Sequence, residues 1–144
     1  MADLTKERFA AKSVEYETPL SLFDPLNKEF CFTTDVCSTH DNKKVAHHWT
    51  KEEDGLSQKW EGVCWCNPPY GREMPNWIRK AIEASKEGTT TVMLIPARTN
   101  TGWWHELVMP HFEIRFVRGR PKFNGGEHGL PFPLAILVII GRKQ

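Results

Sequence analysis

The tetrapeptide Asn67-Pro68-Pro69-Tyr70, which directly follows the apolar run 63–66, has the residue types needed to hold a planar nitrogen. The Asn67 side-chain oxygen and the Pro68 carbonyl both accept hydrogen bonds, and the two prolines keep the turn rigid. Such preorganised acceptors suit a planar exocyclic amine, a poor nucleophile that must be oriented before it attacks a methyl donor. Tyr70 offers a surface for stacking a planar ring. The tetrapeptide therefore predicts methyl transfer to a planar nitrogen, and the simpler interpretation is an ordinary turn.

The segments on either side of this turn alternate between strand and helix patterns. Thr18 is a suitable N-cap and Pro19 a suitable first residue for a helix over about 19–29, and a second helix follows the tetrapeptide and ends near Gly88. A short helix is predicted over 102–108, and strands are predicted at 31–37, 63–66, 89–95, 113–117 and 134–140. The pattern predicts an α/β fold with a mostly parallel sheet, an antiparallel last strand and helices on both faces.

Three residues mark where ligands are expected to bind. Asp35, Asn67 and Pro96 stand at or just past the ends of predicted strands. Ligands of open α/β sheets bind at the carboxyl ends of the strands, so we expect these residues to line one cleft. The segment 42–60 is too short for two full strand-helix-strand units, which predicts that the early half of the sheet is abbreviated.

Composition indicates one ordinary domain. The chain has 144 residues, of which 40% are hydrophobic and 26% charged, and no apolar run approaches the roughly 20 residues of a membrane-spanning helix. The formal net charge of +1 neither requires nor excludes a polyanionic partner. The first residues lack the pattern of a secretory signal, so we expect a cytoplasmic protein without disulfides. A single domain is expected over 1–144, with a flexible N-terminus over 1–15.

The cysteines raise the question of a metal site. Cys64 and Cys66 are separated by one residue, which is not the two-residue spacing of common zinc sites. His47 and His48 would be the partners needed to complete such a site, but buried cysteine more often packs as a small hydrophobic side chain. We therefore expect no metal.

Further motifs follow one another from Tyr16 to Phe123. They are Tyr16-Glu17-Thr18-Pro19, Leu22-Phe23, the segment 32–37, Asp54-Gly55-Leu56 with Trp60, the segment 67–71, the segment 94–99, Trp103-Trp104-His105 and the segment 119–123. Together these motifs resemble the phage-type DNA N-6-adenine methyltransferases. The resemblance implies an abbreviated Rossmann-like class I methyltransferase fold, S-adenosylmethionine as the methyl donor and adenine in DNA as the acceptor. A phage origin would place the protein in the cytoplasm of a bacterial host.

The resemblance also implies which residues touch the cofactor and the target base. Asp35 and Thr18-Pro19 would lie at the methionine end of the cofactor, and Asp54 with Leu56 would lie near its adenine. The residues implied to bind the cofactor are Thr18, Pro19, Asp35, Cys37, Asp54, Leu56 and Asn67. The residues implied to be catalytic are Asn67, Pro68, Pro69 and Tyr70, acting on an adenine that is flipped out of the duplex and attacks in line.

Two basic segments are candidates for contact with DNA. Arg98 and Thr99 follow a buried strand, and Arg118, Arg120 and Lys122 open the Gly/Pro-rich loop 118–133. Basic side chains on such a loop are often only solvated, but we favour contact with DNA phosphates because no other segment is an obvious DNA reader. Trp103 and Trp104 follow Arg98, and we expect them to pack in the core rather than to contact DNA.

Three alternatives remain open. The tetrapeptide also occurs in methyltransferases that act on a protein glutamine or on an RNA guanine. The chain could instead be a non-catalytic DNA-binding relative, or a zinc-stabilised module. The DNA recognition sequence, the ribose-binding residue and the oligomeric state do not follow from the sequence, although a homodimer would add DNA-binding surface.

Overall fold

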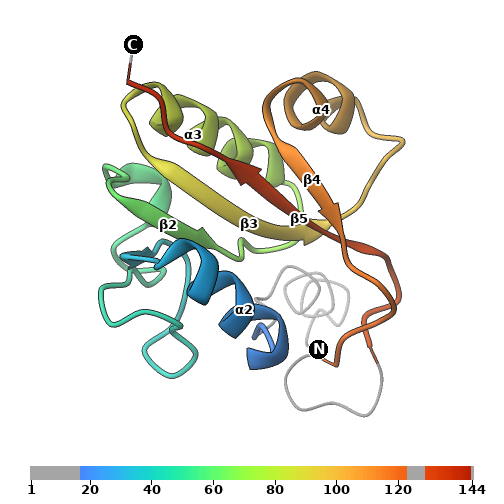
Figure 1. The fold of residues 1–144 in the computed structure, drawn as a ribbon, viewed down its shortest axis with the longest axis horizontal. Helices are drawn as coiled ribbons and strands as arrows, with labels where there is room; N and C mark the ends of the chain where they lie inside the picture. The colour runs from blue at the N-terminus through green and yellow to red at the C-terminus, as the bar shows by residue number, and fades with distance from the viewer. Residues whose placement is uncertain (1–16, 123–128, 144) are drawn as a thin grey trace, which may run out of the picture.

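The computed structural model describes residues 17–122 and 129–143 and contains a five-stranded mixed sheet (Figure 1). The strands are β1 (Thr34–Asp35), β2 (Val63–Cys66), β3 (Thr90–Pro96), β4 (Glu113–Phe116) and β5 (Leu134–Ile139), in the spatial order β1-β2-β3-β5-β4. β1, β2 and β3 pair in parallel, and β5 runs antiparallel to both of its neighbours. The predicted mostly parallel sheet with an antiparallel last strand is confirmed, and β3 lies at its centre.

Helices cover both faces of this sheet (Figure 1). α2 (Leu20–Phe30) lies on one face, and α3 (Met74–Lys86) lies on the other together with a π-helical turn (Trp104–Val108) that continues into α4 (Met109–His111). The predicted helices over 19–29 and 102–108 and the helix ending before Gly88 are therefore confirmed. No helix within 17–122 or 129–143 has the length and apolar character to cross a bilayer.

The apolar face of α2 explains where this helix docks. Phe23 of α2 meets Trp65 of β2 with ring centroids 5.2 Å apart, so Trp65 points toward α2. At the other side of the sheet, both terminal nitrogens of Arg115 on β4 donate to the Glu29 carboxylate at 2.8 Å. Trp65 and Arg115 lie on the same face of the sheet. Trp65 pairs with Val92 of β3, and Arg115 pairs with Ile136 of β5. Ile136 in turn pairs with the residue two places after Val92, which points to the same face as Val92. Side-chain contacts therefore link α2 to both β2 and β4.

The predicted strand at 31–37 is wrong at both ends, since only 34–35 form a strand. Cys31 closes α2 in the left-handed conformation, with φ 55°, and its N–H donates to the Asn27 carbonyl at 2.8 Å. The Phe32 N–H is then taken by the Asn27 side chain at 3.0 Å. Backbone groups engaged in ending a helix are unavailable to a sheet, so only Thr34 and Asp35 form β1.

The predicted N-cap is also wrong. Pro19 occupies the cap position of α2, and no side chain caps this helix end. The Thr18 hydroxyl accepts a hydrogen bond from the Asn67 side chain instead, at 3.0 Å. A contact between distant segments has therefore replaced the local one that the sequence favours.

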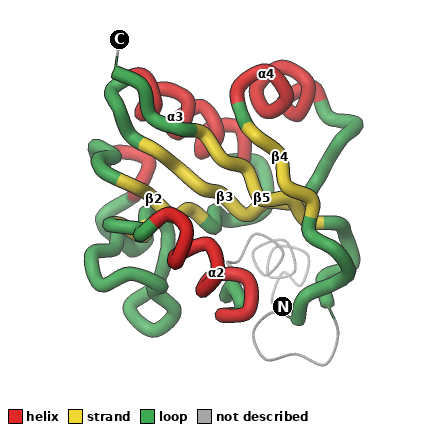
Figure 2. The backbone as a smooth tube through the Cα atoms, viewed as in Figure 1, coloured by secondary structure: helices red, strands yellow, loops and turns green. Residues whose placement is uncertain are grey.

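The segment between β1 and β2 is mostly loop (Figure 2). Its only named element is the 3-10 turn Gly55–Ser57, so the predicted abbreviation of the early half of the sheet is confirmed for these described residues. This turn packs tightly: a Cβ added to Gly55 would lie 2.1 Å from the Val36 carbonyl oxygen and 3.2 Å from the Trp77 ring. The residue at position 55 must therefore lack a side chain.

We predict that Gly55→Ala destabilises the protein by about 2 kcal/mol, because the added methyl group overlaps backbone that cannot move freely. Gly102→Ala is the matched control, since its added Cβ would meet nothing closer than the Glu106 carboxylate at 3.9 Å. Urea unfolding of the two variants measures the difference. Equal midpoints for both variants would show that the turn yields to the added atom.

Candidate active site

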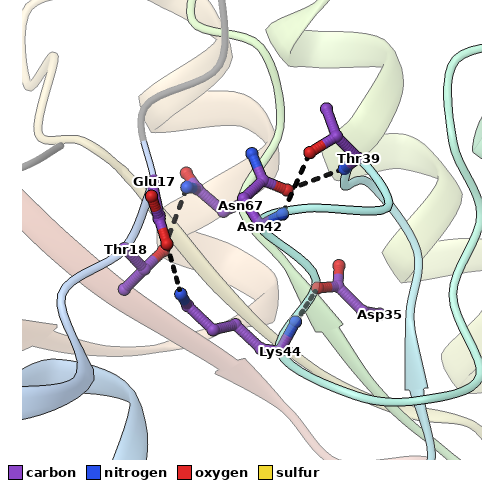
Figure 3. Close-up of polar contacts among 7 residues, drawn as sticks. All are labelled: Glu17, Thr18, Asp35, Thr39, Asn42, Lys44 and Asn67. Carbon is purple, nitrogen blue, oxygen red and sulfur yellow. Dashed lines mark hydrogen bonds and ion pairs between the residues drawn. The ribbon is translucent and has the colours of Figure 1, made fainter.

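Parallel pairing brings the ends of β1 and β2 to one edge of the sheet. Thr34 pairs with Cys64 and Asp35 with Trp65, so Asp35 and the residue after β2, Asn67, leave the sheet side by side. Here lies a small hollow, which we call the polar pocket (Figure 3). It is lined by Glu17, Thr18, Asp35, Cys37, Ser38, Asn42, Lys44, Trp65 and Asn67.

Asp35 is a buried carboxylate, with only 1% of its surface exposed. Its Oδ1 accepts from the Cys37 N–H at 3.3 Å, and its Oδ2 accepts from the Lys44 N–H at 2.9 Å. Burial raises the pKa of Asp35 to about 6, even though these two hydrogen bonds act in the opposite direction. Each carboxylate oxygen has a second acceptor site, so Asp35 is suited to receive a cationic N–H group.

The Asn67 side chain is held from the opposite side of the polar pocket. Its Nδ2 donates to the Thr18 hydroxyl at 3.0 Å, and both residues are buried (Figure 3). With the nitrogen directed at Thr18, the amide oxygen has one preferred direction. The Thr18 hydroxyl, just before α2, therefore orients the Asn67 side chain and does not cap the helix.

Tyr70, at the other end of the tetrapeptide, faces a different hollow. This aromatic cavity has a volume of about 630 Å³ and is lined by Tyr70, Gly71, Met74, Pro96, Arg98, Thr101, Trp103, Pro131 and Phe132. The Tyr70 hydroxyl donates to the Leu94 carbonyl at 3.3 Å, and its ring meets that of Phe132 edge-on at 5.9 Å. Pro68 is buried and Pro69 half-buried between Asn67 and Tyr70, so the tetrapeptide connects the wall of the polar pocket to the wall of the aromatic cavity.

The expectation of a single cleft is therefore wrong in one respect. Asp35 and Asn67 line the polar pocket, but Pro96, at the end of β3, lines the aromatic cavity. The rigid turn after β2 stands between the neighbouring strand ends and divides one edge of the sheet into two hollows. Asn67 and Tyr70 face one hollow each.

A comparison with known proteins decides the family. The family model described as DNA N-6-adenine-methyltransferase (Dam) matches residues 8–132. The chain belongs to this Dam family. It is 32% identical over 100 residues to a protein of Haemophilus phage HP1 (strain HP1c1), covering 68% of this chain and 58% of the relative. It is 31% identical over 111 residues to a protein of Escherichia phage T1, covering 74% and 46%. Both relatives are named DNA N-6-adenine-methyltransferase, and the chain spans about half of their length.

Among the residues that the family resemblance implicated, Cys37 lines the polar pocket, whereas Asp54 and Leu56 line neither hollow. Asp54 Oδ1 accepts from the Leu56 N–H at 3.2 Å and so opens the turn Gly55–Ser57. Because Gly55 lies against Val36, the residue after Asp35, this turn stands beside the end of β1. A ligand that extends from the polar pocket past Val36 would reach it.

The residues predicted to contact DNA differ from Arg115 in their surroundings. Arg98, Thr99, Arg118, Arg120 and Lys122 are all exposed. Arg98 also lies over the Phe132 ring at 4.9 Å, at the aromatic cavity. Arg115, in contrast, donates to Glu29 and Glu113 and holds α2 on the sheet, so it belongs to the fold rather than to a DNA surface.

Part of the basic loop falls outside the described residues. Lys122 and Gly129 form an antiparallel bridge where the loop 118–133 leaves and re-enters the described chain. The segment 123–128 between them is not described, and neither is the N-terminal stretch 1–15 that the sequence predicts to be flexible. Phe123 and Tyr16, at the two limits of the family motifs, are outside as well.

The two tryptophans have different positions. Trp104 is 3% exposed and packs in the core, as predicted. Trp103 is half-buried, packs against Trp104 at 6.1 Å and lines the aromatic cavity, so the prediction that it belongs to the core alone is incomplete. Its ring is available to the contents of that cavity.

Cys64 and Cys66 pack in the hydrophobic core. Cys64 and Cys66 are buried, and burial raises the pKa of Cys64 to about 12 and that of Cys66 well above its usual range. The His47 ring is hydrogen-bonded to Thr34 and the His48 ring to His40. Within 17–122 and 129–143, no group of three or more His, Cys, Asp or Glu side chains could hold a metal ion.

Several lining residues carried no functional signal in the sequence. In the polar pocket these are Ser38, Asn42 and Lys44, and in the aromatic cavity they include Met74, Thr101 and Phe132. Lys44 reaches the polar pocket because the loop after β1 turns back, and the Lys44 N–H donates to the Asp35 carboxylate. A loop that folds back in this way has no periodic pattern in its sequence. Glu17 belongs to one of the family motifs, but the resemblance assigned cofactor binding to its neighbour Thr18 and not to Glu17.

We predict that burial of Asp35 makes stability depend on pH. The folded protein binds the Asp35 proton more tightly than the unfolded chain, with a pKa of about 6 against 3.8. The contribution of Asp35 is therefore fully present below about pH 4 and is lost as the pH rises through 6. The free energy of unfolding of the wild type, relative to Asp35→Asn, should fall by about 3 kcal/mol across this window. A difference between the two proteins that does not change with pH would contradict the assignment.

Proposed function

We propose that this chain transfers a methyl group from S-adenosylmethionine to the 6-amino group of adenine in DNA. The observation that carries this proposal is the position of the tetrapeptide 67–70, which presents Asn67 to a polar pocket and Tyr70 to an aromatic cavity. Membership of the Dam family supports adenine as the acceptor, and the two phage relatives carry that activity in their names. The proposal concerns the activity of the region that this chain shares with them.

The sheet is consistent with an abbreviated class I methyltransferase fold. Its strand β5 runs antiparallel between β3 and β4, and the residues proposed to bind ligands follow β1, β2 and β3. Carboxyl ends of parallel strands are where Rossmann-like sheets bind their ligands. The loop-rich connection between β1 and β2 replaces the strands and helices that a full-length sheet would carry there (Figure 2).

The polar pocket fits the amino-acid end of S-adenosylmethionine. Asp35 would receive the α-amino group, since a buried carboxylate whose pKa is raised gains from an ammonium partner. Thr18, Pro19 and Cys37 stand around the same hollow or next to it, and the turn at Asp54 and Leu56 lies farther along, where the cofactor adenine would be held. When bound, the cofactor supplies an electrophilic methyl group.

The aromatic cavity fits the target base. Its volume of about 630 Å³ falls in the range of small-molecule sites, roughly 300–1,000 Å³. Tyr70, Phe132 and Trp103 offer stacking surfaces, which offset the cost, about a few kcal/mol, of taking a base out of the duplex. The amine of the base would extend from the aromatic cavity toward the Asn67 end of the turn, where the oxygen of Asn67 and the carbonyl of Pro68 would accept from it and favour its pyramidal, more nucleophilic form.

Methyl transfer then requires positioning rather than strong base catalysis. Asn67 and Pro68 would hold the amine toward the methyl group that the cofactor supplies, and because the turn is rigid neither acceptor would have to move into place during the reaction. The nitrogen loses its proton easily once it carries the methyl group. Arg98, Thr99, Arg118, Arg120 and Lys122, all exposed, would contact DNA phosphates around the aromatic cavity.

We predict that the purified protein incorporates labelled methyl groups from S-adenosylmethionine into DNA as N-6-methyladenine. Asn67→Ala should lower this incorporation at least about 100-fold, because the oriented acceptor is lost. Asn76→Ala is the control, since Asn76 is exposed on α3 and its side chain bonds Glu73 and Arg79 among the described residues.

The site of the label distinguishes the alternatives. Label in protein or RNA rather than DNA would favour a glutamine or a guanine as the acceptor. DNA binding without binding of S-adenosylmethionine in calorimetry would favour a non-catalytic relative. Digestion of the labelled DNA to nucleosides, followed by mass spectrometry, identifies the methylated base.

A further inference from the structure

Lys44 is a lysine buried within the polar pocket. Only 8% of its side chain is exposed, although lysine is among the residues least often buried in proteins. Its backbone N–H donates to Asp35 Oδ2 at 2.9 Å, and its side chain extends from there toward Glu17 and Thr18 (Figure 3). The pocket therefore contains a carboxylate from the end of β1 and an ammonium group from the loop that follows it.

The contact between Lys44 and Glu17 does not use the whole capacity of the ammonium group. Lys44 Nζ lies 3.4 Å from Glu17 Oε1, which is longer than the 2.7–2.9 Å or so of a strong charge-assisted hydrogen bond. The Glu17 side chain is half exposed, so water screens this pair. An ammonium group carries three N–H donors, and a second carboxylate can be accommodated beside Glu17.

Ser38 provides an independent sign of a ligand. It lines the polar pocket and is 3% exposed, and its hydroxyl has no hydrogen-bond partner among the described residues. Buried hydroxyl groups in proteins are nearly always paired, so an unpaired one at the wall of a pocket indicates a position for a ligand atom. Its donor can serve an anion as Lys44 can.

We infer that Lys44 and Ser38 bind the α-carboxylate of the cofactor's amino-acid end, while Asp35 binds its α-amino group. This assignment rests on the proposed function and adds two residues to the site. The pocket then matches an α-amino-acid zwitterion: the negative group meets a buried ammonium and a free hydroxyl donor, and the positive group meets a buried carboxylate. Glu17 holds the Lys44 side chain in place before the ligand arrives.

Calorimetry with two ligands tests the assignment. S-adenosylhomocysteine carries the amino-acid end, and 5′-methylthioadenosine carries the same nucleoside and sulfur without it. Lys44→Met should weaken S-adenosylhomocysteine binding by about 10- to 100-fold and Ser38→Ala by about 3- to 10-fold, as expected for hydrogen bonds to a charged group. Binding of 5′-methylthioadenosine should change less than about twofold in both variants.

Two further variants serve as controls. Lys43→Met removes the neighbouring lysine, which is exposed and bonds the His40 carbonyl, and should leave both affinities unchanged. Lys44→Arg retains the charge and should recover part of the S-adenosylhomocysteine affinity. Thermal unfolding of each variant shows that it is folded before it is titrated.

The possible failures can be told apart. If Lys44→Met binds S-adenosylhomocysteine as the wild type does, or loses affinity for both ligands equally, the carboxylate assignment is overturned while the proposed function stands. If the folded wild type binds neither ligand, the proposed function fails and the assignment fails with it. A loss confined to the ligand with the amino-acid end supports both.

Discussion

The hydrogen bond from the Asn67 amide to the Thr18 hydroxyl joins segments 49 residues apart, and the geometry of both hollows depends on it. Thr18 stands just before α2, so this bond fixes the start of that helix against the end of β2. It also selects the orientation of the Asn67 side chain, on which the proposed recognition of an amine rests. One buried contact therefore serves the packing of the N-terminal helix and the chemistry of the tetrapeptide together.

The rest of the fold supplies rigidity to this contact. α2 is held at β2 by the rings of Phe23 and Trp65 and at β4 by the bidentate pair of Arg115 and Glu29. β3, buried along nearly all of its length, supports the turn after β2 through the bond from the Tyr70 hydroxyl to the Leu94 carbonyl. The polar pocket is the costly part of this arrangement. Asp35 is buried in this pocket, and the Ser38 hydroxyl at its wall has no hydrogen-bond partner among the described residues, so the site is less stable without a ligand than with one bound.

Periodic features of the sequence predicted most of the fold. Apolar patterns and turn residues predicted the strands β2, β4 and β5, the helix α3 and the antiparallel last strand, because these elements are determined by local sequence. One error occurred where a long-range contact replaced a local preference. Thr18 binds Asn67 instead of capping α2. A local contact caused another error, because the bond from the Cys31 N–H to the Asn27 carbonyl ends α2 where a strand was predicted to begin. Lys44, Ser38 and Phe132 reach the two hollows through irregular loops, so their positions depend on the tertiary fold and on no pattern of residues.

The central claim is that Thr18 orients Asn67 so that its oxygen faces the target amine, and single-turnover methylation of DNA by Thr18→Val tests it most directly. Valine keeps the shape of threonine but cannot accept from the Asn67 amide. With cofactor and DNA both saturating, the methylation rate should fall about 100-fold, as for a reacting group held out of position, while Thr18→Ser stays near the wild type. A Thr18→Val protein that binds both substrates and methylates at the wild-type rate would contradict the account.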